Sequence, residues 1–142
     1  IMFSSNTSTD AHNLYIDGVN VQDKQNSTTG TIDFTRTDYA VGAATNGTSK
    51  FNGDIAELYF TTEFIDLSTH TNRLKFLAAD GTSADLGADG STPTGTQPIL
   101  YLANPFGTFQ NNLGSGGNFT ENGELTTGLA VRSIFANDMS SE

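Results

Sequence analysis

The chain has 142 residues, enough for one domain, and its 6 Lys plus Arg against 16 Asp plus Glu give a formal net charge of −10. Nucleic acid and anionic membrane surfaces are bound chiefly through Lys and Arg, so both are poor candidates for partners. The chain has no cysteine, which excludes disulfides, thiolate zinc sites and a cysteine nucleophile. Ten Phe and four Tyr favour a turn-rich β protein over disorder.

The strongest strand signals lie in the first sixty residues. The segment NLYIDGVNV, at 13–21, places Asp-Gly between two apolar runs, which predicts a hairpin with a type I′ turn. Shorter strands are predicted at 31–35 and 39–44, and a further strand at 54–60 follows two Asn-Gly turn signals. No run of about 18 apolar residues is present, so no membrane-spanning helix is predicted.

One helix is predicted in the second half of the chain, over 69–79. Ser68 is a suitable N-cap, Leu74 begins an apolar stripe with i, i+3, i+4 spacing, and Gly81 is placed to end the helix as the C′ residue. No other segment combines these start and stop signals.

The remaining segments predict loops and further strands. A Gly/Asp/Thr-rich loop at 80–96 leads to a buried strand at 98–102, and a tight hairpin is predicted at 119–126. The last segment, 127–142, is expected to form an edge strand or an arm that packs on a neighbouring subunit. Short strands separated by turn signals predict an all-β fold, an antiparallel β-sandwich with one short helix.

Glu57 and Glu63 are the first candidates for catalysis, as the carboxylate pair of a glycosidase. On one straight strand they would face the same side but lie about 20 Å apart, at about 3.3 Å per residue. Retaining and inverting glycosidases need about 5–5.5 Å and about 6.5–9.5 Å. The two cannot be one pair on such a strand, and Glu57 is expected to be structural unless another strand supplies its partner.

Asp80, Asp85 and Asp89 lie in the Gly-rich loop and are candidate calcium ligands. Their spacing does not match the EF-hand pattern, and Asp next to Gly is also ordinary turn chemistry. The same turn interpretation applies to Asp17 and Asp54. Calcium is therefore an open option, and no metal ligand is assigned.

The only histidines, His12 and His70, lie in no recognisable nucleophile motif, so neither is assigned a catalytic role. The glycines of GSGG, at 114–117, lack the Lys-Ser/Thr and the strand–helix context of a phosphate-binding loop. No catalytic residue is predicted.

Aromatic and amide side chains at 104–112 offer a candidate sugar platform. The alternative is a loop that folds over the end of a sandwich with Phe as its anchor. The residues concerned are Asn104, Phe106, Phe109, Asn111 and Asn112. Four glycosylation sequons, at Asn6, Asn26, Asn46 and Asn118, are expected by chance in a chain this rich in Asn, Ser and Thr.

NLYIDGVNV and YAVGAATNGTSKFNGDIAELYF (39–60) resemble the second half of a concanavalin A-like lectin/glucanase, or laminin-G-like, domain. The matching features are a strand ending in L-Y-x-D-G and a strand of the type F-x-G-x-I-x-E-L. The resemblance implies a jelly-roll sandwich and covers about residues 13–60. The family's early strands, its usual Trp and the catalytic Glu-x-Asp-x-Glu strand of its glucanases have no counterpart here. The chain is therefore expected to be part of a longer polypeptide.

Residues 64–126 look like an extension found in phage and prophage structural proteins that carry this sandwich. That likeness implies a component of the virion exterior, a capsid decoration or tail-associated protein, in an oligomer. Residues 1–126 would then be the C-terminal part of the sandwich, with the helix and loop extension at about 64–126, and 127–142 an inter-subunit arm.

The expected function is non-enzymatic: contacts with other virion proteins and with copies of the chain, together with recognition of host glycans, with no residue assigned to ligand binding. Two alternatives stay open. One is a glycan hydrolase or lyase of the same fold, and the other is a calcium-dependent surface adhesin.

Overall fold

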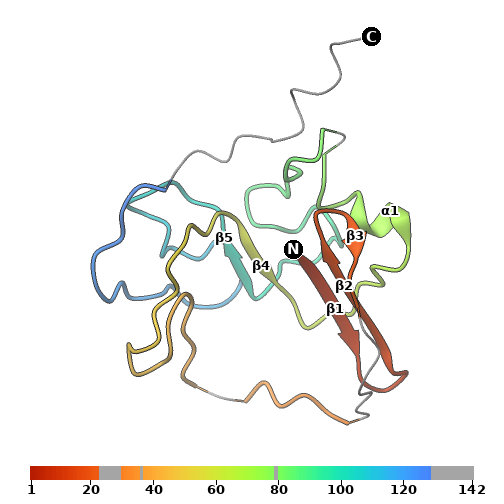
Figure 1. The fold of residues 1–142 in the computed structure, drawn as a ribbon, viewed down its shortest axis with the longest axis horizontal. Helices are drawn as coiled ribbons and strands as arrows, with labels where there is room; N and C mark the ends of the chain where they lie inside the picture. The colour runs from red at the N-terminus through yellow and green to blue at the C-terminus, as the bar shows by residue number, and fades with distance from the viewer. Residues whose placement is uncertain (23–29, 36, 79, 129–142) are drawn as a thin grey trace.

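The computed structural model describes residues 1–22, 30–35, 37–78 and 80–128, and its regular structure is almost entirely antiparallel β (Figure 1). The prediction of an all-β chain with little helix is thus confirmed. One sheet has three strands in the order β1-β2-β3, and the other pairs β4 with β5. The elements are β1 (Met2–Asn6), β2 (Ala11–Ile16), β3 (Val19–Asn20), β4 (Leu58–Phe60), α1 (His70–Arg73) and β5 (Leu100–Leu102).

The predicted hairpin is confirmed as β2 and β3. Asp17 and Gly18 both have positive φ, 49° and 77°, as a type I′ turn requires, and the Val21 amide donates to the Leu14 carbonyl at 2.9 Å. The register pairs Tyr15 with Asn20 and Ile16 with Val19. Strand β1 was not predicted from the sequence, since it is short and rich in serine.

Residue pairing in this sheet places its side chains on two contrasting faces. Directly paired residues of an antiparallel ladder share a face, and so do residues two apart on a strand. One face, here the asparagine face, carries Met2, Ser4, Asn6, Ala11, Asn13, Tyr15 and Asn20. The other, the apolar face, carries Phe3, Ser5, His12, Leu14, Ile16 and Val19.

The asparagine face is the covered one. Its Ser4, Asn13 and Tyr15 are buried, whereas Phe3 and Val19 on the apolar face are exposed. A one-sided antiparallel sheet ordinarily buries its apolar face, so this sheet has the reverse arrangement.

The second sheet is shorter than predicted because the backbone turns at Glu57. Glu57 has φ of 53°, in the left-handed region, so the strand expected over 54–60 begins only at Leu58. β4 then pairs with β5 in the register Leu58 with Leu102 and Phe60 with Leu100. The strand predicted at 98–102 is confirmed for its last three residues.

Three predicted β segments are not strands. At 31–35 the Asp33 carboxylate accepts hydrogen bonds from the Thr35 amide and hydroxyl, so side-chain bonds hold the backbone in a turn. At 39–44 the chain turns at Gly42, whose φ is 74°. At 119–126 the Leu125 amide donates to a Glu121 carboxylate oxygen, and no hairpin forms.

The predicted helix is also wrong in extent, since α1 is a single turn of four residues. Ser68 does not cap it: the Asp66 carboxylate binds the Ser68 amide and hydroxyl, and Thr69 takes the N-cap position without a side-chain cap bond. Beyond α1 the Ala84 amide bonds the Phe76 carbonyl at 3.1 Å. Gly81, with φ of 80°, lies in the turn of this small hairpin and does not end a helix.

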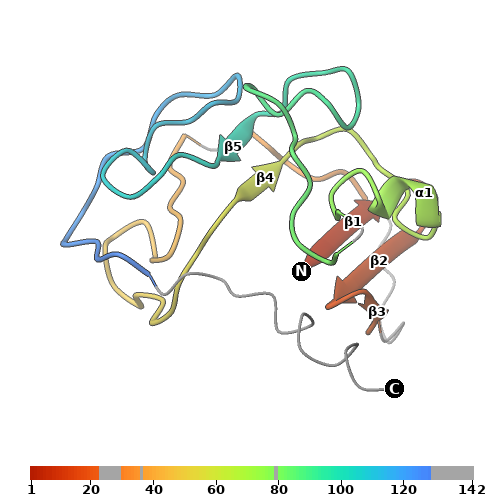
Figure 2. The ribbon, with the colours of Figure 1, turned by 90° about the horizontal axis from the view of Figure 1, so that it is seen from above.

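The two sheets occupy separate positions, and the chain passes from the first to the second between β3 and β4. The segment between β4 and β5 carries α1, which lies beside the three-stranded sheet (Figure 2). Around β4 and β5, Tyr59 makes edge-on ring contacts with Phe76 and Tyr101, at centroid distances of 5.2 and 6.4 Å. The buried core among the described residues is small. Apart from Pro93 and Pro98, its buried apolar side chains are Tyr15, Leu67, Leu86, Tyr101 and Leu102.

Candidate functional site

The principal hollow of the described structure is an open cleft of about 710 Å³. It lies between the three-stranded sheet and the segment 64–68, and it is here called the asparagine cleft. Most of the residues that line it have polar side chains, and none is Lys or Arg. The cleft is lined by Asn6, Thr9, Asp10, Ala11, His12, Asn13, Asn20, Gln22, Phe64, Asp66 and Ser68.

Strand register brings three amides of the cleft together. Asn6, Asn13 and Asn20 come from three successive strands and share the asparagine face. Asn6 Oδ1 accepts from the Ser8 amide at 3.1 Å, and Asn20 Oδ1 accepts from the Gln22 amide at 3.0 Å. These local bonds orient the side chains.

Asn13 is the most enclosed of the three asparagines, with 8% of its surface exposed. Its Nδ2 group donates to Ser4 Oγ over 3.5 Å, which is a long hydrogen bond. Within the described residues, neither its Oδ1 nor Asn6 Nδ2 has a protein partner. Neither atom is among the fully enclosed unpartnered atoms of the described residues, so both are accessible for bonding water or a ligand in the cleft.

The opposite wall of the cleft is held by Asp66 and Phe64. Asp66 Oδ1 accepts from the Ser68 hydroxyl at 2.6 Å and from the Ser68 amide at 2.9 Å. These bonds, the hydroxyl's first, hold the pKa of the Asp66 carboxyl below its ordinary value, because they stabilise the charged form. Phe64 is 37% exposed, and with Asp66 it also lines a second hollow of about 310 Å³.

Arg73 fixes this wall to the sheet. Its Nη1 group donates to the Leu67 carbonyl at 2.6 Å, to the Ser68 carbonyl at 3.0 Å and to the Tyr15 hydroxyl at 3.2 Å. The guanidinium also lies 4.5 Å from the centre of the Tyr15 ring. One cation therefore sets the position of the wall relative to β2.

His12 lies between Ser5 and Asp10 in a hydrogen-bonded arrangement that resembles a catalytic triad. Its Nδ1 lies 2.8 Å from Ser5 Oγ, and its Nε2 lies 3.2 Å from Asp10 Oδ1. With the Nε2 proton directed to Asp10, Nδ1 accepts from the Ser5 hydroxyl. However, Ser5 lies on the apolar face and does not line the cleft. A molecule in the cleft would not meet this hydroxyl, and the arrangement orients the imidazole.

Glu57 and Glu63 are not brought together on one strand. They flank the three residues of β4, and both are exposed. Glu63 lines the smaller hollow, while Glu57 lines neither hollow. Glu57 acts on Tyr101, whose pKa is raised first by burial and then by this negative charge.

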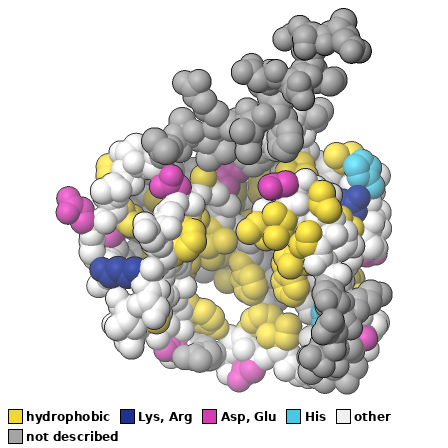
Figure 3. All heavy atoms as spheres, viewed as in Figure 1, with side chains coloured by type: hydrophobic (Ala, Val, Ile, Leu, Met, Phe, Trp, Pro, Cys, Tyr) yellow, Lys and Arg dark blue, Asp and Glu magenta, His cyan; other side chains and the backbone are white. Residues whose placement is uncertain are grey.

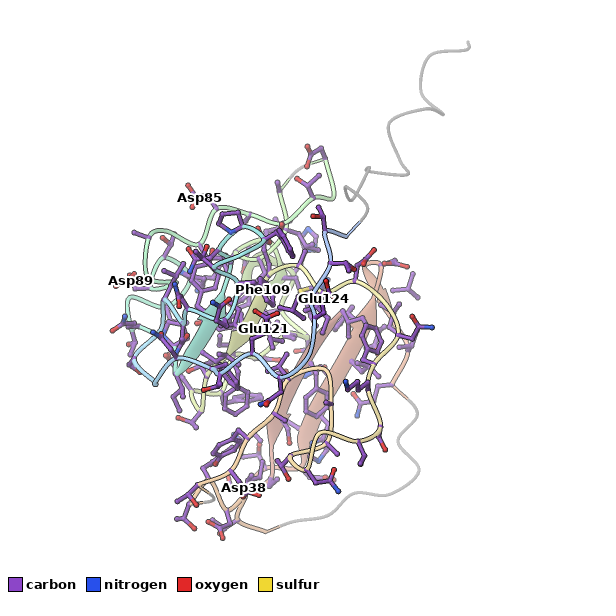
Figure 4. All side chains as sticks on the ribbon, turned by 90° about the vertical axis from the view of Figure 1, so that its left-hand side faces the viewer. Asp38, Asp85, Asp89, Phe109, Glu121 and Glu124 are labelled. Atoms are coloured by element: carbon purple, nitrogen blue, oxygen red, sulfur yellow. The ribbon has the colours of Figure 1, made fainter. Side chains whose placement is uncertain are left out.

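The three candidate calcium ligands each serve their own turn. Asp80, Asp85 and Asp89 accept hydrogen bonds from the backbone amide two residues further on, at 3.0, 2.9 and 3.1 Å. Figure 4 shows Asp85 and Asp89 at separate points on the rim of the molecule. In the part of the chain that the structure describes, no three His, Cys, Asp or Glu side chains converge on a metal position.

The asparagines proposed for a sugar platform hold the loop 97–119 together. Asn112 Oδ1 accepts from the Tyr101 amide at 2.8 Å, and its Nδ2 donates to the Ile99 carbonyl at 2.9 Å. Asn104 Nδ2 donates to the Asn111 carbonyl at 2.8 Å. These bonds fit the folded loop of the alternative, but Phe106 is exposed and does not anchor it.

The other sequence candidates also have local partners. His70 lies on α1, and its Nδ1 is 3.2 Å from Arg73 Nη2. In GSGG, the Gly116 amide donates to the Ile99 carbonyl at 2.9 Å, so the glycines bring two backbones together. The sequon residue Asn26 and residues 129–142 of the predicted arm lie outside the described residues.

The asparagine cleft could not be found from the sequence. The three asparagines are spaced by seven residues, but this spacing brings them to one face only because β1 pairs with β2 in the observed register. Compared with protein-family models, curated proteins and solved structures, the chain gives no match. Among the described residues, no helix has the length and apolar character needed to cross a membrane.

Proposed function

We propose that this chain is a non-enzymatic structural module of a virion, a capsid decoration or tail-associated component, that works through contacts with other protein chains. The supporting observation is the uncovered apolar face of the three-stranded sheet. Phe3 is 66% exposed and Val19 is 63% exposed, and Ile16 beside them is also exposed. Burying apolar area contributes about 25 cal/mol per Å², so covering this face with another chain would stabilise both.

The free edge of β1 adds backbone hydrogen-bonding groups to this surface. In the described sheet β1 pairs only with β2, which leaves its other edge open. An open edge with apolar neighbours can accept a strand from another chain. The proposed contact combines this edge with the apolar face, and a second copy or a different virion protein would supply the strand.

Other exposed apolar side chains gather away from this sheet. Phe34 and Phe60 touch each other, with ring centroids 5.9 Å apart, yet both are exposed. Figure 3 shows hydrophobic side chains gathered around a hollow in the face that it views. Clustered apolar surface of this kind is typical of interaction sites, whereas single exposed residues are ordinary.

The finer architecture is part of the same proposal. The five strands would belong to a concanavalin A-like jelly-roll sandwich, completed by strands from a neighbouring chain. The L-Y-x-D-G segment supports this, since it forms the β2–β3 turn. The F-x-G-x-I-x-E-L segment gives less support, because its backbone is a strand only from Leu58 onward.

Sedimentation velocity across a concentration series tests the assembly function. The chain is expected to self-associate, and Val19→Asp is expected to shift it to monomer, because the charge would be buried in the contact. Phe106→Asp, at a residue also exposed but in the loop 97–119, serves as the matched control. A chain that stays monomeric and does not bind hydrophobic dyes would contradict the proposal.

Recognition of a glycan is a second candidate function, favoured by the asparagine cleft. The cleft lies on the other face of the same sheet, so neither function blocks the other. The Ser5–His12 hydrogen bond lies on the apolar face and gives no specific support to a hydrolase.

A further inference from the structure

We propose that the asparagine cleft binds a neutral oligosaccharide, with Phe64 as the surface for one sugar ring and Asn6 and Asn13 as hydrogen-bonding partners. The inference rests on the proposed role in glycan recognition and deepens it by naming the site and the ligand class. It does not depend on the assembly contacts, which lie on the opposite face of the sheet.

The charge of the cleft selects against anionic ligands. Asp10 and Asp66 line it, and no Lys or Arg does. A sulfated, phosphorylated or sialylated ligand would meet two carboxylates in the cleft and no Lys or Arg, in a chain whose formal charge is −10. In the adjoining hollow Lys75 is accompanied by Glu63 and Asp66, so the carboxylates outnumber the cation there too. The ligand should therefore be neutral or cationic.

The carboxylates are a poor match for a cation. Asp66 Oδ1 already accepts two hydrogen bonds from Ser68, and Asp10 Oδ1 lies 3.2 Å from His12 Nε2. A bound ammonium group would compete with these contacts. Besides the second oxygen of each carboxylate, the cleft offers side-chain amides, which both donate and accept, and sugar hydroxyls do the same.

Hydrogen-bonding capacity in the cleft fits a hydroxyl-rich molecule. Asn13 Oδ1 is an acceptor and Asn6 Nδ2 a donor, and both lack protein partners within the described residues. They lie on adjacent strands and on the same face. A site built to bond hydroxyls discriminates against a ligand without them, because such a ligand displaces water from these amides and leaves them unpaired.

Phe64 and the second hollow determine the size of the ligand. The negative π face of a phenyl ring attracts the weakly positive C–H groups of a sugar ring. Phe64 and Asp66 line both the 710 Å³ cleft and the 310 Å³ hollow, so the two spaces adjoin. A chain of two or three sugars could contact both, whereas a single sugar would fill only part of one.

Side-chain amide NMR on the full chain, labelled with nitrogen-15, tests the proposal. The probes are three neutral trisaccharides, maltotriose, mannotriose and triacetylchitotriose, with sialyllactose as an anion and spermidine as a cation. At millimolar concentrations, at least one neutral trisaccharide is expected to shift the Asn6 and Asn13 amide signals. Sialyllactose is expected to shift neither, and spermidine is expected to give smaller shifts.

Phe64→Ala should raise the dissociation constant of the trisaccharide about tenfold, which corresponds to a loss of about 1.4 kcal/mol of binding free energy. Phe106→Ala removes an exposed phenyl ring outside the cleft and should change nothing. Absence of shifts with all three neutral sugars would overturn the proposal, and so would stronger binding of spermidine. Val19→Asp separates the two functions, since it should abolish self-association while leaving the sugar titration unchanged.

Discussion

The Arg73 guanidinium lies 4.5 Å from the centre of the Tyr15 ring and donates a hydrogen bond to the Tyr15 hydroxyl at 3.2 Å. The two residues are 58 positions apart in the sequence, and their contact joins β2 to the segment that carries α1. It explains why the asparagine face is the covered one: Arg73 also binds the carbonyls of Leu67 and Ser68. The polar contact thereby holds this segment over Tyr15 and Asn13.

Arg73→Lys should therefore destabilise the fold. Lysine lacks the planar fork that bonds several oxygens at once and stacks on a ring, so a loss of about 2 kcal/mol is expected. Urea unfolding followed by circular dichroism measures it. Lys75→Gln, two residues away and exposed, is the matched control and should stay within about 0.5 kcal/mol of the wild type. Equal effects of the two changes would show that the Arg73 contacts contribute nothing specific.

Removal of the side-chain hydroxyl should change the stability of the fold in opposite directions at Tyr59 and Tyr15. The Tyr59 hydroxyl is enclosed and has no hydrogen-bond partner in the described residues, since the nearby Thr94 hydroxyl donates to the Thr96 carbonyl. Tyr59→Phe should be neutral or slightly stabilising, because it removes an unpaired buried polar group. Tyr15→Phe loses the bond from Arg73 and should cost about 1.5 kcal/mol.

Alkaline titration gives a second measurement on the same pair. Burial raises the pKa of Tyr59 above its ordinary value of 10.0, and the Glu63 charge reinforces this shift. A raised pKa in the folded state means that the contribution to stability is present below pH 10.0 and is lost as the pH rises through the folded value. The Tyr59→Phe variant should lose less stability than the wild type on going above pH 10.0. An unchanged alkaline profile would contradict this assignment.

The glycines of GSGG give a sharp test of the packing under β5. A Cβ atom on Gly114 would lie 2.6 Å from the Pro98 carbonyl oxygen and 2.8 Å from that of Ile99. Both obstacles are backbone atoms, so Gly114→Ala should cost about 2 kcal/mol or more. At Gly117 a Cβ would meet nothing within 4 Å, and Gly117→Ala should be neutral or stabilising by up to about 1 kcal/mol. Equal unfolding midpoints for the two variants would rule out the close approach.

Local turn chemistry could be predicted from the sequence, but the choice of sheet face could not. Asp-Gly at 17–18 needs no distant contact to form its turn, and the hairpin prediction was confirmed. The alternation of Leu14, Ile16 and Val19 would ordinarily direct these residues inward. Instead the asparagine face is covered, through a cation 58 residues away. The exposed apolar face of the three-stranded sheet is accounted for if another chain covers it.

Side-chain hydrogen bonds that compete with regular backbone structure explain most of the strands and caps that were predicted but do not form. Asp33 and Asp66 each bind the amide and hydroxyl two residues ahead, which replaced a predicted strand at 31–35 and a predicted N-cap at Ser68. Glu57 illustrates a different limit. Left-handed backbone at a glutamate is rarely anticipated from sequence, yet it decides where β4 begins. Glu57, expected from the sequence to be a structural residue within a strand, is an exposed turn residue immediately before β4.

The Asp66 carboxylate makes the wall of the asparagine cleft sensitive to acid. Its two hydrogen bonds from Ser68 hold its pKa below the ordinary value of 3.8. A depressed pKa in the folded state means that the contribution to stability is fully present above pH 3.8 and is lost as the pH falls through the folded value. Asp66→Asn should therefore be less stable than the wild type near neutral pH, and the difference should vanish in acid.

Carboxyl carbon-13 NMR can follow Asp66 directly. Ser68→Ala removes the hydroxyl donor, which has the larger effect, and keeps the backbone amide, so it should move the pKa of Asp66 part of the way back toward 3.8. The same change should weaken trisaccharide binding less than Phe64→Ala does, because the wall retains its Arg73 contacts to the backbone. If Ser68→Ala leaves the titration of Asp66 unchanged, the hydroxyl is not the group that sets it.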